Sequence, residues 1–147
     1  MIVDSFLAEI LDGIHQSGDE YRVALYVPGT KLNPRTSVRY TTVGEVGESY
    51  RDERGDMQST GYKAGGQILT GRRLVRDGSV SFLDWDSPVW SRVSISAREV
   101  MIFNATRENR AVSVFEMDRT FISTNGDFIV ELPEPTAKTA VVRIGRM

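Results

Sequence analysis

The feature that most constrains the fold is a change in hydrophobic period at Tyr21. Over residues 2–16, apolar side chains recur every three or four positions, which is the spacing of an amphipathic helix. From Tyr21 to Val27, they occupy every second position, which is typical of a strand with one face buried. Strand-like segments then crowd the second half of the chain, so we expect one helix followed by many strands.

The N-terminal region, residues 1–18, is expected to hold the only long helix. Its apolar stripe comprises Ile2, Val3, Phe6, Leu7, Ile10, Leu11 and Ile14. Gly13 or Gly18 can end the helix, because glycine readily takes the left-handed conformation of a C-terminal cap. The stripe either packs on the sheet of the same domain or docks on a neighbouring subunit. In both cases we expect the face to be shielded from water.

A β-hairpin is predicted where segments 68–75 and 79–83 meet at Asp77-Gly78, a dipeptide typical of a tight type I′ turn. Further strands are expected at 93–103, 111–117, 128–132 and 139–144, with turns at Asn109 and at Asn125-Gly126. This series of short strands predicts a mainly β fold, a sandwich or jelly roll forming a single domain over residues 1–147.

Residues 28–66 are rich in Gly, Pro, Thr and Ser and are expected to form long loops. A short strand is predicted near 38–43, and a charged segment covers 48–56. The glycines of segment 61–66 could cradle a phosphate, but no Gly-Lys-Ser/Thr ending follows them. We therefore expect these glycines to allow tight turns or a close approach of another backbone. A bend is expected at 132–135.

Composition excludes several classes of function. The 147 residues contain no cysteine, which excludes thiolate chemistry. Their formal net charge of -2 gives no general electrostatic attraction to nucleic acid. No apolar run is long enough to span a membrane, and no signal peptide is recognisable, so we expect synthesis in the cytoplasm. His15 is the only histidine and is expected at the surface, without the partners of a catalytic triad.

Two groups of acidic residues are candidates for a metal-binding or catalytic site. Asp84 and Asp86 flank Trp85, while Asp52, Glu53 and Asp56 lie in the charged segment. Paired carboxylates can bind calcium or cleave glycosides, but neither group has the spacing of a calcium loop. Solvated loop acids are the favoured interpretation. We expect no catalytic residue, no cofactor and no metal site.

Aromatic side chains around Pro88 are more informative. Two tryptophans beside a proline in a loop either plug the end of a β-sandwich or anchor an interface, and the sequence leaves both open. Together with the helix stripe and two loop tyrosines, they define the candidate interface residues. These are Phe6, Leu7, Ile10, Leu11, Phe82, Trp85, Trp90, Tyr50 and Tyr62.

The order of several short blocks resembles small virion proteins of tailed bacteriophages. After the helix come Arg-Val-Ala-Leu-Tyr-Val at 22–27, Leu-Asn-Pro at 32–34, Ser-Thr-Gly-Tyr-Lys-Ala-Gly-Gly at 59–66 and Leu-Thr-Gly at 69–71. The later blocks are the Asp- and Trp-containing segment 82–90, Ser-Ile-Ser-Ala-Arg at 94–98 and Ser-Thr-Asn-Gly-Asp-Phe at 123–128. The chain departs from the pattern at the charged insert 48–56 and at the bend 133–135. The resemblance implies a β-rich structural component of the particle, associated with the head and without catalytic activity.

Four functions are compared. The leading one is a capsid decoration or cement protein of the phage head that binds the major capsid protein or other virion proteins, as a homo-oligomer on the particle. A head-fibre base, connector or tail component is the second. The third is a carbohydrate-binding β-sandwich that stacks sugars on Trp85 and Trp90, and the fourth is a hydrolase that uses the acidic residues. We expect no membrane and no nucleic-acid partner.

Overall fold

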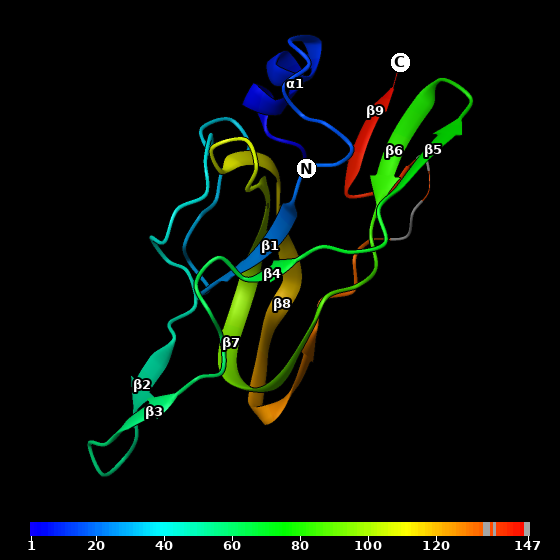
Figure 1. Ribbon diagram of the computed structural model, residues 1–147. Coiled ribbons are helices and arrows are strands. Elements are labelled where there is room, and N and C mark those ends of the chain that lie inside the picture. Colours follow the sequence, from blue (N-terminus) through cyan, green and yellow to red (C-terminus); the bar gives the residue numbers. More distant parts are fainter. Residues whose placement is uncertain (134–135, 137, 146–147) are drawn as a thin grey trace.

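The computed structural model describes residues 1–133, 136 and 138–145. This part of the chain is mainly β, as predicted, with one short helix and several antiparallel sheets (Figure 1). The elements are α1 (Asp4–Leu11), β1 (Tyr21–Tyr26), β2 (Ser49–Arg51), β3 (Met57–Ser59), β4 (Gln67–Ile68), β5 (Arg73–Asp77), β6 (Val80–Asp84), β7 (Val89–Asn104), β8 (Arg110–Ile129) and β9 (Val142–Gly145).

Helix α1 is shorter than the predicted span of 2–16. Ile2 lies outside it and pairs with Ser113 of β8 as an isolated bridge, so the chain enters the helix from the sheet. Of the two glycines expected to end the helix, Gly13 does so, because it has a φ of +69° and donates its N–H to the carbonyl of Ile10 at 3.0 Å. Its apolar stripe is only partly covered: Phe6 is buried, but Leu11 is 89% exposed. The stripe is therefore not fully covered by the sheet of the same chain, and its shielding by a neighbouring subunit stays a prediction.

The four-stranded sheet has the order β4-β1-β7-β8. Strand β1 lies between β4 and β7, with Val23 opposite Ile102. Ala24 and Tyr26 are as fully buried as Val23 and Leu25, so both faces of β1 are covered. The sequence alternation had predicted one buried face only, because Arg22 and Tyr26 read as polar positions.

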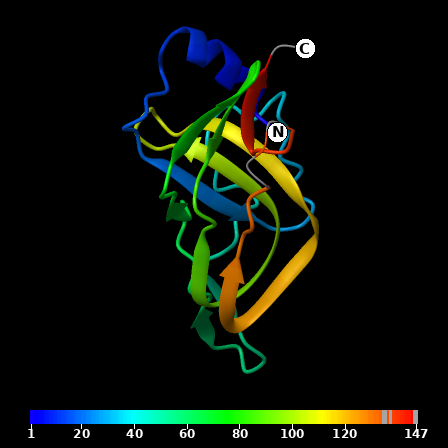
Figure 2. The same cartoon turned by 90° about the vertical axis from the view of Figure 1, so that its right-hand side faces the viewer.

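Strands β7 and β8 form one long, strongly bent ribbon (Figure 2). The predicted turn at Asn109 joins them, with left-handed backbone at Glu108 and Asn109. The predicted turn at Asn125-Gly126 is wrong, because both residues lie inside β8. Asn125 has a φ of +46° there. It lies across from the part of β7 near Val93, where shifts in the pairing register mark bulges. A bulge and a tight turn require the same left-handed residue, which explains the error.

The predicted hairpin exists as β5 and β6, two strands of the β5-β6-β9 sheet. Its turn lies one residue later than expected. Asp77 pairs with Val80, so Gly78 and Ser79 form the loop, and the φ of +60° at Gly78 fits a type II′ turn. The predicted strand 68–75 is split into β4 and β5 at Gly71, which has a φ of +70°.

Most of the region 28–66 lacks regular structure, as predicted, although the strand expected at 38–43 is only an isolated bridge between Arg39 and Arg110. The charged segment contains β2 and is followed directly by β3, and the two strands pair as a hairpin that projects from the body (Figure 1). The last predicted strand is β9. Of the predicted bend, Glu134 and Pro135 lie outside the described residues. Within the described part of the chain, no helix is long and apolar enough to cross a membrane.

Candidate functional site

The nine candidate interface residues divide into two groups in the structure. Five are buried in the chain itself: Phe6, Tyr62, Phe82, Trp85 and Trp90. Four are exposed: Leu7, Ile10, Leu11 and Tyr50. Only the exposed group can present apolar area to a partner in this conformation. Three of its four members lie on α1.

The two tryptophans belong to the core. Trp85 is 2% exposed and lies against Tyr21, with ring centroids 5.7 Å apart. Trp90 is 3% exposed and lies against Tyr62 at 6.2 Å. Both tryptophans are therefore buried within the chain and are not exposed to anchor an interface in this conformation. Sugar stacking needs an open aromatic face, so the carbohydrate-binding alternative loses the platforms on which it depended.

The glycine-rich segment serves a structural purpose. The Tyr62 hydroxyl donates to Glu45 at 2.6 Å and accepts the backbone N–H of Leu25 at 3.0 Å, and burial raises the pKa of Tyr62 far above its usual value. The Gly65 N–H donates to Glu45, while the Ala64 N–H donates to Glu48. Carboxylates of the protein thus already occupy amides that a phosphate would need.

The acidic residues also have partners within the chain. Asp84 and Asp86 both bind the Arg73 guanidinium, at 2.6 and 2.9 Å. Asp52 accepts the backbone N–H groups of Arg54 and Asp56 and so shapes the tip of the β2–β3 hairpin. Among the residues that the structure describes, no group of three or more His, Cys, Asp or Glu side chains could hold a metal ion.

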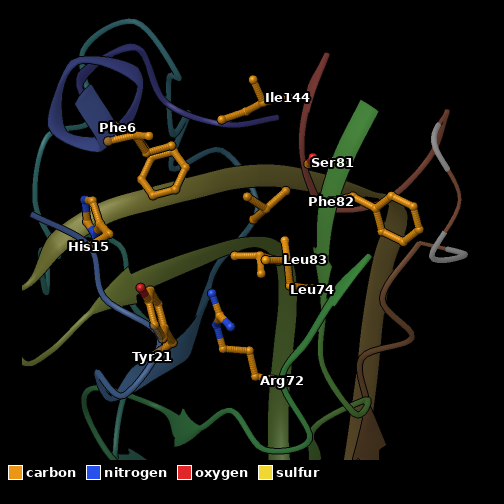
Figure 3. A pocket seen from close by; sticks show the side chains of 11 residues that line it. Phe6, His15, Tyr21, Arg72, Leu74, Ser81, Phe82, Leu83 and Ile144 are labelled. Atoms are coloured by element: carbon orange, nitrogen blue, oxygen red, sulfur yellow. The ribbon is translucent and has the colours of Figure 1, made fainter. Parts of the chain in front are cut away.

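A groove lies between α1 and the three-stranded sheet (Figure 3). Its cavity has a volume of about 170 Å³, similar to cavities that accept one aromatic ring. The sheet side is a cross-strand row of Leu74, Leu83 and Val142, with Ile144 beside it. We call this cavity, with its apolar walls, the α1 groove.

The rim of the α1 groove is apolar and open to water. Leu74 is 63% exposed, Ile144 41% and Ile10 36%. Leu11, the next residue along the helix, is 89% exposed but does not line the cavity. An apolar surface assembled from a helix and a sheet edge is typical of a site that a partner covers. Of the sheet residues that line the groove, the sequence had identified Phe82 but not Leu74 or Ile144.

Arg72 marks the polar end of the groove. Its side chain extends into the cavity between Tyr21 and Leu74 (Figure 3). Its Nε is buried and has no hydrogen-bond partner among the described residues. A buried, unpaired guanidinium nitrogen is costly, so this end of the groove favours a negatively charged or hydrogen-bond-accepting group.

His15 closes the other side of the groove and is buried, not at the surface as predicted. Its side chain is 4% exposed. The carboxamide oxygen of Asn104 accepts the Thr106 N–H, so its amide nitrogen donates to His15 Nδ1 at 3.0 Å. The ring proton therefore resides on Nε2 and is donated to Glu9 at 2.9 Å.

This histidine is part of a larger polar cluster beneath the helix. Glu9 also binds Arg110 at 2.9 Å. Asp19 accepts bonds from Asn104 at 2.8 Å and from the Arg107 guanidinium at 2.9 and 3.0 Å. The hydrogen bond from Arg107 lowers the pKa of Asp19 to about 2. All ring nitrogens and carboxylate groups are engaged, so the cluster anchors α1 and leaves no free general base.

Comparison with protein-family models, curated proteins and solved structures finds no match to this chain.

Proposed function

We propose that this protein is a structural component of a tailed-phage virion that decorates the head and binds the major capsid protein. Binding uses the end of the molecule formed by α1 and the β5-β6-β9 sheet. The observation that carries the proposal is the open apolar rim of the α1 groove, formed by Ile10, Leu74 and Ile144. The order of sequence blocks, which resembles that of small virion proteins, is the reason for proposing another virion protein as the partner.

The same proposal includes the finer fold. The two larger sheets form an open β-sandwich with jelly-roll-like character. Support comes from a core shared between them, since Val142 of β9 and Trp85, next to β6, belong to the same buried cluster as Val23 and Ile102. An experimental structure that separated these residues into two cores would contradict this assignment.

The role of such a subunit is binding and not catalysis. A subunit that binds the assembled lattice but not the free capsid protein stabilises the shell by mass action. Repeated over many copies, binding raises the temperature at which the head bursts. The projecting β2–β3 hairpin, with Tyr50 and Met57 exposed, offers a second contact that reaches an adjacent capsid subunit.

The test is to compare heads prepared with and without the protein. We expect the protein on purified heads at stoichiometric copy number, visible by electron microscopy, and a higher temperature of DNA release when it is present. Unchanged head stability, together with absence from purified heads, would reject head decoration. Protein found at the neck or tail instead would favour the fibre-base, connector or tail alternative.

A further inference from the structure

One of the two outer strands of the three-stranded sheet is β5, and its far edge is open (Figure 1). All five of its residues are exposed. Asp77 and Val80 flank a two-residue loop, so they form a hydrogen-bonded pair. Hydrogen bonding to β6 then alternates along β5 and involves Arg73, Val75 and Asp77. The backbone groups of Leu74 and Arg76 therefore point to the open edge, where the described part of the chain places no other strand.

The side chains along this edge have a distinct pattern. Leu74 and Arg76 share one face of β5 because side chains alternate along a strand, and Arg72 reaches the same α1 groove (Figure 3). No ion-pair partner is found for Arg72 or Arg76 within residues 1–133, 136 and 138–145. Arg73, on the opposite face, is in contrast bound by Asp84 and Asp86.

We propose that β5 accepts an added strand from an acidic and apolar segment of a partner polypeptide. This segment carries an acidic residue, an apolar residue and a second acidic residue at alternate positions. Opposite them lie Arg72, Leu74 and Arg76. Backbone hydrogen bonds to the edge supply affinity, and the alternating side chains supply specificity. The inference rests on the proposed function and names the chemistry of the segment that binds there.

The spacing of the charges sets the register of the partner. Arg72 and Arg76 are four residues apart, which is about 13 Å along an extended chain. Two carboxylates separated by three residues match this distance in an added strand. The apolar residue between them then faces Leu74, whose side chain is 63% exposed and covers one wall of the groove. Cross-strand pairs of this kind are the units that stabilise a sheet.

A second copy of the chain fits this edge poorly. An antiparallel pairing centred on Leu74 places Arg72 opposite Arg76, and like charges directly opposite destabilise a strand pair. A pairing centred on Val75 places Leu74 opposite Arg76 and supplies no carboxylate to either arginine. The charge pattern therefore favours a partner with acidic residues over self-association.

The experiment measures binding of fluorescein-labelled extended peptides to the full chain by anisotropy. One peptide has the pattern Glu-x-Leu-x-Glu, where x is Thr, and the control has Lys in place of Glu. We expect the acidic peptide to bind roughly tenfold more tightly, and less so at high salt, because each exposed charge pair contributes modestly. Methylation of alternate peptide nitrogens should abolish binding, since it removes the backbone donors.

Variants of the chain locate the site. Arg72→Gln and Arg76→Gln should each weaken binding of the acidic peptide several-fold. Arg143→Gln should not, because Arg143 lies on the face of the sheet opposite to Val142 and the α1 groove. Thermal melts confirm that each variant is folded. Equal binding of both peptides, equal loss with Arg143→Gln, or dimerisation through β5 in sedimentation velocity would overturn the inference.

Failure of the inference and failure of the proposed function give different results. If the wild-type chain and the Arg72→Gln variant decorate heads equally, the inference of an added acidic strand is wrong while head decoration stands. If the wild-type chain is absent from heads but binds the acidic peptide selectively, the edge site stands and head decoration is wrong. Loss of both acidic-peptide selectivity and head binding would reject both.

Discussion

Gly66 offers the sharpest test of how tightly β4 approaches β1. A Cβ built at Gly66 would lie 2.7 Å from the carbonyl carbon of Val23 and closer still to its oxygen. Both neighbours are backbone atoms of a fully buried strand, so neither can rotate away. Gly66→Ala must therefore separate the start of β4 from β1.

The cost can be estimated from the contacts that would be lost. Gly66 has a φ of +66°, so an alanine there first incurs a left-handed penalty of about 1 kcal/mol. Separation then breaks the pairing of Val23 with Gln67 and the bond from Arg22 Nη2 to the Gly66 carbonyl, 3.0 Å long. At about 1 kcal/mol for a neutral hydrogen bond and about 2 kcal/mol for a charged one, the total is about 4 kcal/mol.

Gly13→Ala is the matched control. Gly13 has a nearly identical φ of +69°, but nothing lies within 4 Å of a Cβ built there. Its expected cost is only the backbone penalty of about 1 kcal/mol. Urea unfolding followed by tryptophan fluorescence measures both variants, because the two tryptophans are buried. If Gly66→Ala costs no more than Gly13→Ala, the close approach of the two backbones is not a constraint.

Three further predictions follow from burial, charge and exposure. Trp90→Ala should lower the free energy of unfolding by about 3–5 kcal/mol, whereas Tyr50→Ala should change it by less than about 0.5 kcal/mol, both measured by urea unfolding. The pKa of Asp19 lies near 2, below its value in the unfolded chain, so its contribution to stability is complete above about pH 4 and is lost as pH falls toward 2. The stability difference between wild type and Asp19→Asn should narrow over that interval, and a constant difference would contradict the ion pair. Leu11→Ser should leave stability within about 0.5 kcal/mol of wild type but reduce occupancy on heads, which sedimentation with purified heads would measure.

Local sequence signals predicted the elements whose residues interact with near neighbours. The β5–β6 hairpin is an example, since its alternating residues and the glycine at its turn lie within a dozen positions. The same signals misjudged β8, because Asn125-Gly126 suits a bulge as well as a turn. They also missed the β2–β3 hairpin, where exposure of both faces leaves no apolar alternation to detect.

The site was harder to predict because its parts are distant in sequence. His15 binds Asn104, 89 positions away, and nothing around His15 indicates that partner. Leu74 and Ile144 read as ordinary strand residues. Their exposure depends on where α1 stops relative to the sheet, which only the tertiary structure determines. The helix stripe was identified correctly as apolar, but periodicity cannot tell a covered face from an open one.

The polar cluster explains why the α1 groove is open. If apolar packing alone positioned the helix, Ile10 and Leu11 would be drawn against Leu74 and Ile144, and the groove would close. Directional bonds instead tie Glu9 to Arg110 and His15 at 2.9 Å, and these hold the helix at the end of the β7–β8 ribbon. Moving the helix onto the three-stranded sheet would leave the largely buried Glu9 carboxylate unpaired, and this cost opposes the gain from apolar contact. A strand added at β5 extends the sheet beside this surface without moving α1.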